Sequence, residues 1–256
     1  MTDIRYVHST AVHNTNSAKE LVPLFINWLK PSSVVDVGCG IGTWLSVFQD
    51  FGVKDIVGID GEYVSKRLLF FDENKFISHD LTKPLNLGRK FDLVVSLEVA
   101  EHLPESSADM FIELLTSLGD VVIFSAAIPN QGGQNHLNEQ WPTYWQGKFN
   151  QHRFNLYDCI RPIIWLNESI DCWYRQNMLL AVREGVQVPI PKTHSISHIV
   201  HPELYNWRVK QLDLFNPNLR NEDFQEITLK VAVNIFLRVL KRQTIALMKS
   251  AKKIYS

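Results

Sequence analysis

The chain has 256 residues, of which 45% are hydrophobic and 21% are charged, and its formal net charge is −1. That composition is typical of a globular protein with a sizeable core, folded as one large domain or as one domain with an appendage. It excludes an overall basic surplus for binding nucleic acid, and no apolar run is long enough to span a bilayer.

The first predicted elements are a helix, a strand and a second helix. Residues 17–29 place apolar side chains on one helical face, and Pro31 follows the end of that helix. An apolar strand covers residues 34–37, and a helix is expected over residues 42–51. Between them Gly38, Gly40 and Gly42 let the backbone turn tightly and approach a ligand without a Cβ clash. Such a turn suits a nucleoside cofactor that lies across a strand end.

Acidic residues follow the next predicted strands. The second strand, residues 55–60, ends in Asp60, which lies about 20 residues after the glycine turn, where an acid can accept hydrogen bonds from ribose hydroxyls. The third strand, residues 75–78, precedes His79-Asp80-Leu81. The fourth begins at Phe91 and leads into residues 96–102, which we expect to line the cofactor.

The remaining elements continue the alternation of strands and helices. Residues 106–118 are predicted to form a helix and residues 120–127 a fifth strand. Residues 157–165 fit either a helix or a strand, and residues 176–182 fit the last strand. This order predicts an open, mostly parallel sheet with helices on both faces.

The pattern Asp36-x-Gly38-x-Gly40-x-Gly42 and the segments after it resemble the class I S-adenosylmethionine-dependent methyltransferases. The resemblance covers residues 17–183. It implies an α/β, Rossmann-like, doubly wound and mostly parallel seven-stranded sheet with an antiparallel last strand. It also implies S-adenosyl-L-methionine as cofactor and S-adenosyl-L-homocysteine as product. The expected cofactor-binding residues are Asp36, Gly38, Cys39, Gly40, Gly42, Trp44, Asp60, Gly61, Asp80, Leu81, Leu97 and Glu98.

Residues 96–102 are one candidate for the acceptor site. The Asn/Asp-Pro-Pro-Tyr/Phe tetrapeptide of adenine and glutamine methylases is absent, which argues against those acceptors. Glu98 could contact cofactor or acceptor, or could be a capping or solvated carboxylate. The pair Glu101-His102 resembles the E-H-L/I of many small-molecule methyltransferases. For Glu101-His102 we favour the role of a structural, hydrogen-bonded pair over that of a catalytic base.

Residues 132–145 form the second candidate, after the fifth strand. Amides and aromatic rings gather in this polar run, and such groups suit a sugar or another polyol. Trp145 is expected to belong instead to a helix packed on the sheet. The predicted acceptor-binding residues are Asn135, Asn138, Trp141 and Tyr144.

A hydroxyl acceptor needs a base, because an alcohol is a weak nucleophile. Histidine titrates near neutrality, so His136 is the first candidate and His102 the second, and Glu139 could orient either imidazole. These three side chains could also hold a divalent metal. No H-E-x-x-H or comparable signature is present, so we expect none.

These observations favour methyl transfer to a hydroxyl of a small polar acceptor, with a sugar or glycan first. The pattern of residues 132–145 resembles bacterial and viral methyltransferases of surface-polysaccharide synthesis. One alternative is a methyltransferase of a quinone-like or other aromatic small molecule. Another is a non-catalytic scaffold protein that binds the cofactor.

Residues 1–185 are predicted to form the methyltransferase domain, and residues 186–256 a linker and a helical extension. Residues 227–256 contain seven basic side chains and no acid, which leaves 19 basic and 27 acidic side chains elsewhere. That balance disfavours nucleic acid as partner. The candidate long helix, residues 221–254, could pack on the domain or form an oligomer interface, and after these it could contact an anionic membrane surface.

Cysteine usage and the amino terminus indicate a cytoplasmic protein, with the membrane surface as an alternative location. Cys39, Cys159 and Cys172 are odd in number and lack metal-type spacing, so we expect reduced thiols. The polar amino terminus has no apolar signal-peptide core.

Overall fold

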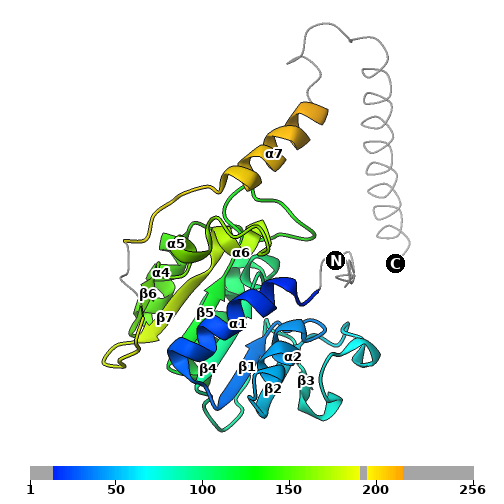
Figure 1. The fold of residues 1–256 in the computed structure, drawn as a ribbon, viewed down its shortest axis with the longest axis vertical. Helices are drawn as coiled ribbons and strands as arrows, with labels where there is room; N and C mark the ends of the chain where they lie inside the picture. Colours follow the sequence, from blue (N-terminus) through cyan, green and yellow to red (C-terminus); the bar gives the residue numbers. More distant parts are fainter. Residues whose placement is uncertain (1–13, 191–194, 216–256) are drawn as a thin grey trace, which may run out of the picture. The chain divides into compact units, whose positions relative to one another are not determined.

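The computed structural model describes residues 14–190 and 195–215 (Figure 1). Their helices are α1 (Asn16–Leu29), α2 (Thr43–Asp50), α3 (Ala108–Leu118), α4 (Pro142–Gln151), α5 (Arg161–Ile164), α6 (Cys172–Asn177) and α7 (Pro202–Phe215). Their strands are β1 (Ser33–Val37), β2 (Asp55–Asp60), β3 (Phe76–Ser78), β4 (Leu93–Leu97), β5 (Val121–Ser125), β6 (Phe154–Tyr157) and β7 (Leu179–Arg183). A short 3-10 helix, η3 (Ala100–His102), follows β4.

The seven strands form one sheet in the order β3-β2-β1-β4-β5-β7-β6. Strands β1 to β5 are parallel, and β7 is antiparallel to both of its neighbours, β5 and β6. The doubly wound, mostly parallel seven-stranded sheet with an antiparallel last strand is therefore confirmed. Strand order reverses between β1 and β4, so their carboxyl ends diverge at a switch point where α/β sheets bind ligands.

Helices cover both faces of the sheet, which explains why β1, β4 and β5 are buried along their whole length. On one face, α1 and α2 contribute Phe25 and Phe48 to a core that includes Val34 of β1. On the other face, α3 and α4 contribute Phe111 and Trp145 to a second core that includes the next residue of the strand. Trp145 is buried in a helix, as predicted from the sequence.

Two predictions near the end of the domain need correction. Residues 157–165 form neither a single helix nor a single strand, because β6 ends at Tyr157 and α5 begins at Arg161 with Pro162 in its first turn. The last strand begins at Leu179 rather than residue 176, because α6 extends to Asn177.

The chain divides into two compact units, residues 1–204 and 205–256. The predicted domain boundary after residue 185 stays a prediction. The candidate long helix, residues 221–254, and the basic run 227–256 lie outside the described residues. No described helix has the length and apolarity needed to cross a membrane.

Candidate active site

The loop after β1 adopts backbone conformations that favour glycine. The φ angle is +84° at Gly38, +54° at Gly40 and +80° at Gly42. A Cβ on Gly38 would lie 2.3 Å from a Val99 methyl carbon, and a Cβ on Gly42 would lie 2.2 Å from the Phe71 ring. The tight turn predicted from the glycine spacing is therefore confirmed, and side chains cannot be added to it without displacing neighbours.

Asp60, at the end of β2, holds this loop. Its Oδ2 accepts a hydrogen bond from the Gly40 amide at 2.7 Å, and its Oδ1 accepts from the Gly61 amide and the Tyr63 hydroxyl, both at 2.6 Å. The residue expected to bind ribose thus also fixes the backbone on which the cofactor would lie. A carboxylate oxygen has two acceptor positions, so Oδ2 retains one for a ligand hydroxyl.

Asp36, near the end of β1, is a buried carboxyl that receives no hydrogen bond from the described residues. Burial, and after it the charge of Asp60, raises the pKa of Asp36 to about 8. A cationic group placed beside it would reverse this shift and stabilise the ionised form. The site therefore fits an ammonium or sulfonium ligand better than an anionic one.

The other expected cofactor residues differ in exposure. Asp80 is half exposed and caps its own turn, with its Oδ1 accepting from the Thr82 amide at 3.0 Å and hydroxyl at 2.6 Å. Leu81 and Leu97 are buried. Trp44 is also buried, and its indole N–H donates to the Tyr174 hydroxyl at 3.4 Å.

Cys39 contributes its backbone to the glycine loop rather than a reactive thiol. Its amide donates to the Ile59 carbonyl at 3.1 Å, and burial raises the thiol pKa well above its usual range. The thiol is therefore protonated at neutral pH.

Glu98 occupies a left-handed backbone conformation directly after β4, with φ at +55°. Its amide donates to both the carbonyl and the hydroxyl oxygen of Ser125, at 3.0 Å each. Its carboxylate accepts from the side-chain amides of Asn177 and Gln131, each at 3.1 Å. Burial raises the pKa of Glu98, although the hydrogen bonds from these amides act to lower it. Left-handed non-glycine residues held by such a network gather at functional sites.

Asn177, Gln131 and Ser125 were not identified from the sequence. They come from the end of α6, the loop after β5 and β5 itself, and no local motif links them. Glu98 is instead held by three segments that become neighbours only when the sheet forms.

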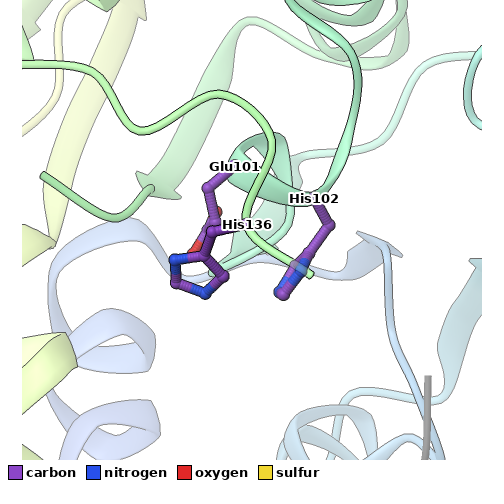
Figure 2. A group of neighbouring side chains, drawn as sticks. All are labelled: Glu101, His102 and His136. Atoms are coloured by element: carbon purple, nitrogen blue, oxygen red, sulfur yellow. The ribbon is translucent and has the colours of Figure 1, made fainter. Parts of the chain in front are cut away.

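Glu101, His102 and His136 form a cluster next to Glu98 (Figure 2). One nitrogen or oxygen of each lies within 4.8 Å of the others, and the two imidazole rings pack edge to face with centroids 4.9 Å apart. Burial, and then the nearby His136, lowers the pKa of His102 to about 4. Hydrogen bonds to the backbone carbonyls of Asn135 and Gln134 act in the opposite direction. Burial, and then the charge of Glu98, raises the pKa of Glu101 well above its usual range.

Glu139 orients His136. Its Oε1 lies 2.8 Å from His136 Nδ1 and accepts from the Gly132 amide at 2.6 Å, and its Oε2 accepts from the Asn130 amide at 2.7 Å. The backbone carbonyl of Glu101 accepts from the amides of Leu137 and Asn138, at 2.7 and 3.0 Å. The loop that carries His136 is therefore fixed against η3. The structure thus brings together the three side chains that the sequence marked as catalytic candidates.

The four expected acceptor-binding residues do not share one environment. Asn138 is buried, and its Oδ1 accepts from the Gln140 amide at 2.9 Å. Trp141 is stacked on His198, with ring centroids 4.8 Å apart, and Tyr144 packs edge to face on the buried Trp145. Asn135, with φ at +60°, lies in the loop beside His136.

Comparison with known families identifies the domain. Residues 13–162, more than half of the chain, match a family model described as a methyltransferase domain. The chain belongs to the class I S-adenosylmethionine-dependent methyltransferases. S-adenosylmethionine is the cofactor of this family and therefore of this methyltransferase. A comparison with curated proteins gives no match.

Several solved structures are similar to this chain at low sequence identity. Magnesium protoporphyrin IX methyltransferase from Synechocystis, solved with S-adenosylhomocysteine, is 19% identical, with 66% of this chain and 83% of that chain covered and a TM-score of 0.47. DesVI from Streptomyces venezuelae is 15% identical, with coverage of 66% and 91% and a TM-score of 0.46. A putative O-methyltransferase from Nostoc punctiforme is 13% identical, with coverage of 66% and 56% and a TM-score of 0.48.

Proposed function

We propose that this methyltransferase transfers a methyl group to a hydroxyl of a small polar acceptor, with a sugar or glycan as the first candidate. The observation that carries this proposal is the 2.8 Å contact between His136 Nδ1 and Glu139 Oε1. An alcohol is a weak nucleophile until its proton is removed, and an imidazole oriented by a carboxylate is a frequent solution.

The residues around His136 support this role. Both oxygens of Glu139 are held by backbone amides, so its carboxylate is fixed before any acceptor arrives. With that carboxylate accepting a hydrogen bond from Nδ1–H, the lone pair of the neutral imidazole lies on His136 Nε2. His102, with its pKa lowered to about 4 by burial and by His136, is a weaker proton acceptor at neutral pH. Of the two histidines, His136 is therefore the better candidate.

The cofactor, when bound, supplies an electrophilic methyl group. The glycine loop and Asp60 would position its nucleoside, with Asp80 and Leu81 at the neighbouring strand end, and the buried Asp36 would face its cationic part. Glu98, held by its amide partners, directly follows β4 and precedes η3, which carries His102.

An acceptor with an apolar face is the second candidate. Leu137, directly after His136, is 63% exposed, which would suit a quinone-like or other aromatic molecule. Polar neighbours such as Gln134 and Asn135 favour the sugar. A non-catalytic scaffold would show cofactor binding without methyl transfer to any acceptor.

The test begins with calorimetric binding of S-adenosylmethionine to the full chain. Release of S-adenosylhomocysteine is then measured with sugars, nucleotide-sugars, glycans and quinols as acceptors. We expect turnover with a hydroxylated acceptor and a fall of about 10²–10⁴-fold in His136→Ala. His152→Ala, outside the site, should keep wild-type turnover. Tight cofactor binding with no turnover on any acceptor would support the scaffold, and turnover on quinols alone would support the aromatic acceptor.

We also propose that residues 186–256 form a linker and a helical extension to a domain of residues 1–185. Their basic run, residues 227–256, would serve packing or oligomerisation first and contact with an anionic membrane surface second. Deletion of residues 221–256 tests this proposal. Loss of pelleting with anionic vesicles would support the membrane role, and a smaller mass in solution would support oligomerisation. A cytoplasmic location, with or without the membrane surface, stays a prediction.

A further inference from the structure

We propose that Glu101, His102 and His136 bind one divalent first-row transition-metal ion. These side chains come from η3 and from the loop before α4, and Figure 2 shows the His136 ring beside both η3 side chains. One donor atom of each lies within 4.8 Å of the others. Metal–ligand bonds of about 2.0–2.2 Å require donors somewhat closer than this, which small side-chain rotations provide.

Glu101 supplies the strongest argument for a cation. Its side chain is fully buried, neither carboxylate oxygen has a hydrogen bond of normal geometry from the described residues, and no ion pair of these residues includes it. The Glu98 carboxyl lies beside it, which adds to the cost of an ionised Glu101. A buried carboxylate without a partner is strongly unfavourable, and a bound cation is one of the few groups that can compensate it. The two histidines beside it are the commonest partners of a carboxylate in such sites.

Glu139 provides the second, independent argument. Metal-binding imidazoles usually donate their other ring N–H to a carboxylate, which fixes the ring and its tautomer. His136 Nδ1 faces Glu139 Oε1 at 2.8 Å, and Glu139 is itself fixed by the amides of Gly132 and Asn130. His136 Nε2 is thereby left as the metal-binding atom.

Two imidazoles and one carboxylate select the class of metal. Mg²⁺ and Ca²⁺ prefer sites made of oxygen, whereas Mn²⁺, Co²⁺ and Zn²⁺ accept nitrogen ligands. Three protein ligands leave coordination positions open for water or an acceptor oxygen. The expectation of no metal rested on a missing local signature, and these donors come from separate segments that only the fold unites.

The role of the metal rests on the proposed function. A hydroxyl bound to the ion would lose its proton more easily, because the metal stabilises the resulting oxyanion. His136 would then be a metal ligand oriented by Glu139. The metal ion, rather than a free imidazole, would activate the acceptor hydroxyl.

The experiment measures metal binding directly, in the absence of cofactor and acceptor. Full-length protein is treated with EDTA, dialysed, and titrated by calorimetry with MnCl₂, ZnCl₂ and MgCl₂ in turn. We expect one Mn²⁺ or Zn²⁺ per chain and Mg²⁺ at least about tenfold weaker. Absence of Mn²⁺ and Zn²⁺ binding would overturn the inference.

Variants locate the ion. Glu101→Gln, His102→Ala and His136→Ala should each weaken Mn²⁺ binding at least about tenfold, whereas His152→Ala should leave it unchanged. Wild-type Mn²⁺ affinity in Glu101→Gln would overturn the site. Retained S-adenosylmethionine binding in each variant shows that it is folded. The melting temperature adds a second readout: Mn²⁺ should raise it in the wild type, whereas Glu101→Gln should melt higher without metal and gain nothing from Mn²⁺.

Failure of this inference is distinguishable from failure of the proposed function. Metal binding without methyl transfer would contradict the proposed function and leave the metal site in place. Methyl transfer that is unaffected by EDTA would contradict the catalytic role of the metal and leave the proposed function in place.

Discussion

Asp60 Oδ2 accepts a hydrogen bond from the Gly40 amide at 2.7 Å, which joins the end of β2 to the middle of the glycine loop. Asp60 ends β2, and Gly40 lies in the loop after β1, the parallel strand beside β2. One carboxylate therefore shapes the loop, and it also has an acceptor position for a ribose hydroxyl. This double use makes Asp60 the most informative position for testing the cofactor site.

We expect Asp60→Ala to weaken S-adenosylmethionine binding roughly 10- to 100-fold. A hydrogen bond to a charged group contributes about 1.5–3 kcal/mol, and the variant also removes the anchor of the Gly40 amide. Calorimetry on folded protein measures the change. Asp109→Ala, which removes a carboxylate whose side chain is 68% exposed, serves as the control. Equal affinity in the Asp60 variant and the wild type would reject this assignment.

Gly133→Ala should lower turnover and leave cofactor affinity unchanged. A Cβ at this position would lie 2.2 Å from His136 Nε2, and the ring cannot easily retreat because Glu139 holds its other nitrogen. Turnover and calorimetric binding are measured side by side. Gly147→Ala is the matched control, because a Cβ at residue 147 would meet no atom within 4 Å. Full turnover in Gly133→Ala would show that the position of His136 is not critical.

Glu139→Gln should reduce turnover at least about tenfold, because a neutral amide no longer stabilises the charge that His136 gains when it accepts a proton. The amide oxygen can still accept from one backbone amide, so the loop should keep much of its structure. Circular dichroism and cofactor affinity check this. Glu113→Gln, on the exposed side of α3, controls for the loss of one charge. Unchanged turnover would remove Glu139 from the mechanism.

The stability of the cofactor-free protein should depend on pH through Asp36. Its pKa is raised by burial from 3.8 to about 8, so the native state keeps a proton that the unfolded chain has lost between these values. Stability therefore falls as pH rises through this window, by about 1.4 kcal/mol per pH unit for one group, and changes no further above it. Asp36→Asn should lack this component.

Urea unfolding at several pH values between about 5 and 8 measures the effect. The free energy of unfolding of Asp36→Asn should rise relative to that of the wild type as pH increases. Asp109→Asn should differ from the wild type by a constant amount. A constant difference for Asp36→Asn as well would mean that Asp36 is ionised in the native state.

The parallel half of the sheet could be predicted from the sequence because each strand carries its own local signal. Apolar runs that end in Asp36 or Asp60, followed by glycine or polar residues, mark strand ends without reference to the rest of the chain. The glycine loop was predictable for the same reason, because the spacing of Gly38, Gly40 and Gly42 is a local signal. All three residues adopt the positive φ that favours glycine.

The antiparallel half of the sheet and the support of Glu98 depend on contacts between distant segments. Strand β6 has only four residues, and its pairing with β7 rather than its own pattern makes it a strand. Asn177 reaches Glu98 across 79 positions of the chain. The role of Asn138 in binding the acceptor stays a prediction, and only the folded loop reveals that this residue is buried beside η3.

Helix α7 was predicted only in outline, within the linker and helical extension of residues 186–256. Pro202 occupies the first position of the helix, where the missing N–H has no cost. A proline in a segment predicted to contain a linker can therefore mark the start of a helix.

The stack of Trp141 on His198 has a consequence for any shortened form of this enzyme. The same segment brings His201 and Glu203 to the buried guanidinium of Arg175, and the Ile199 carbonyl to the side-chain amide of Gln176. A chain that ended before residue 198 would lose Glu203, the counter-charge of the buried Arg175, and would uncover one face of the Trp141 ring. The smallest autonomous catalytic fragment should therefore include residue 204, and proteolytic trimming back to that point should spare activity while deeper trimming abolishes it.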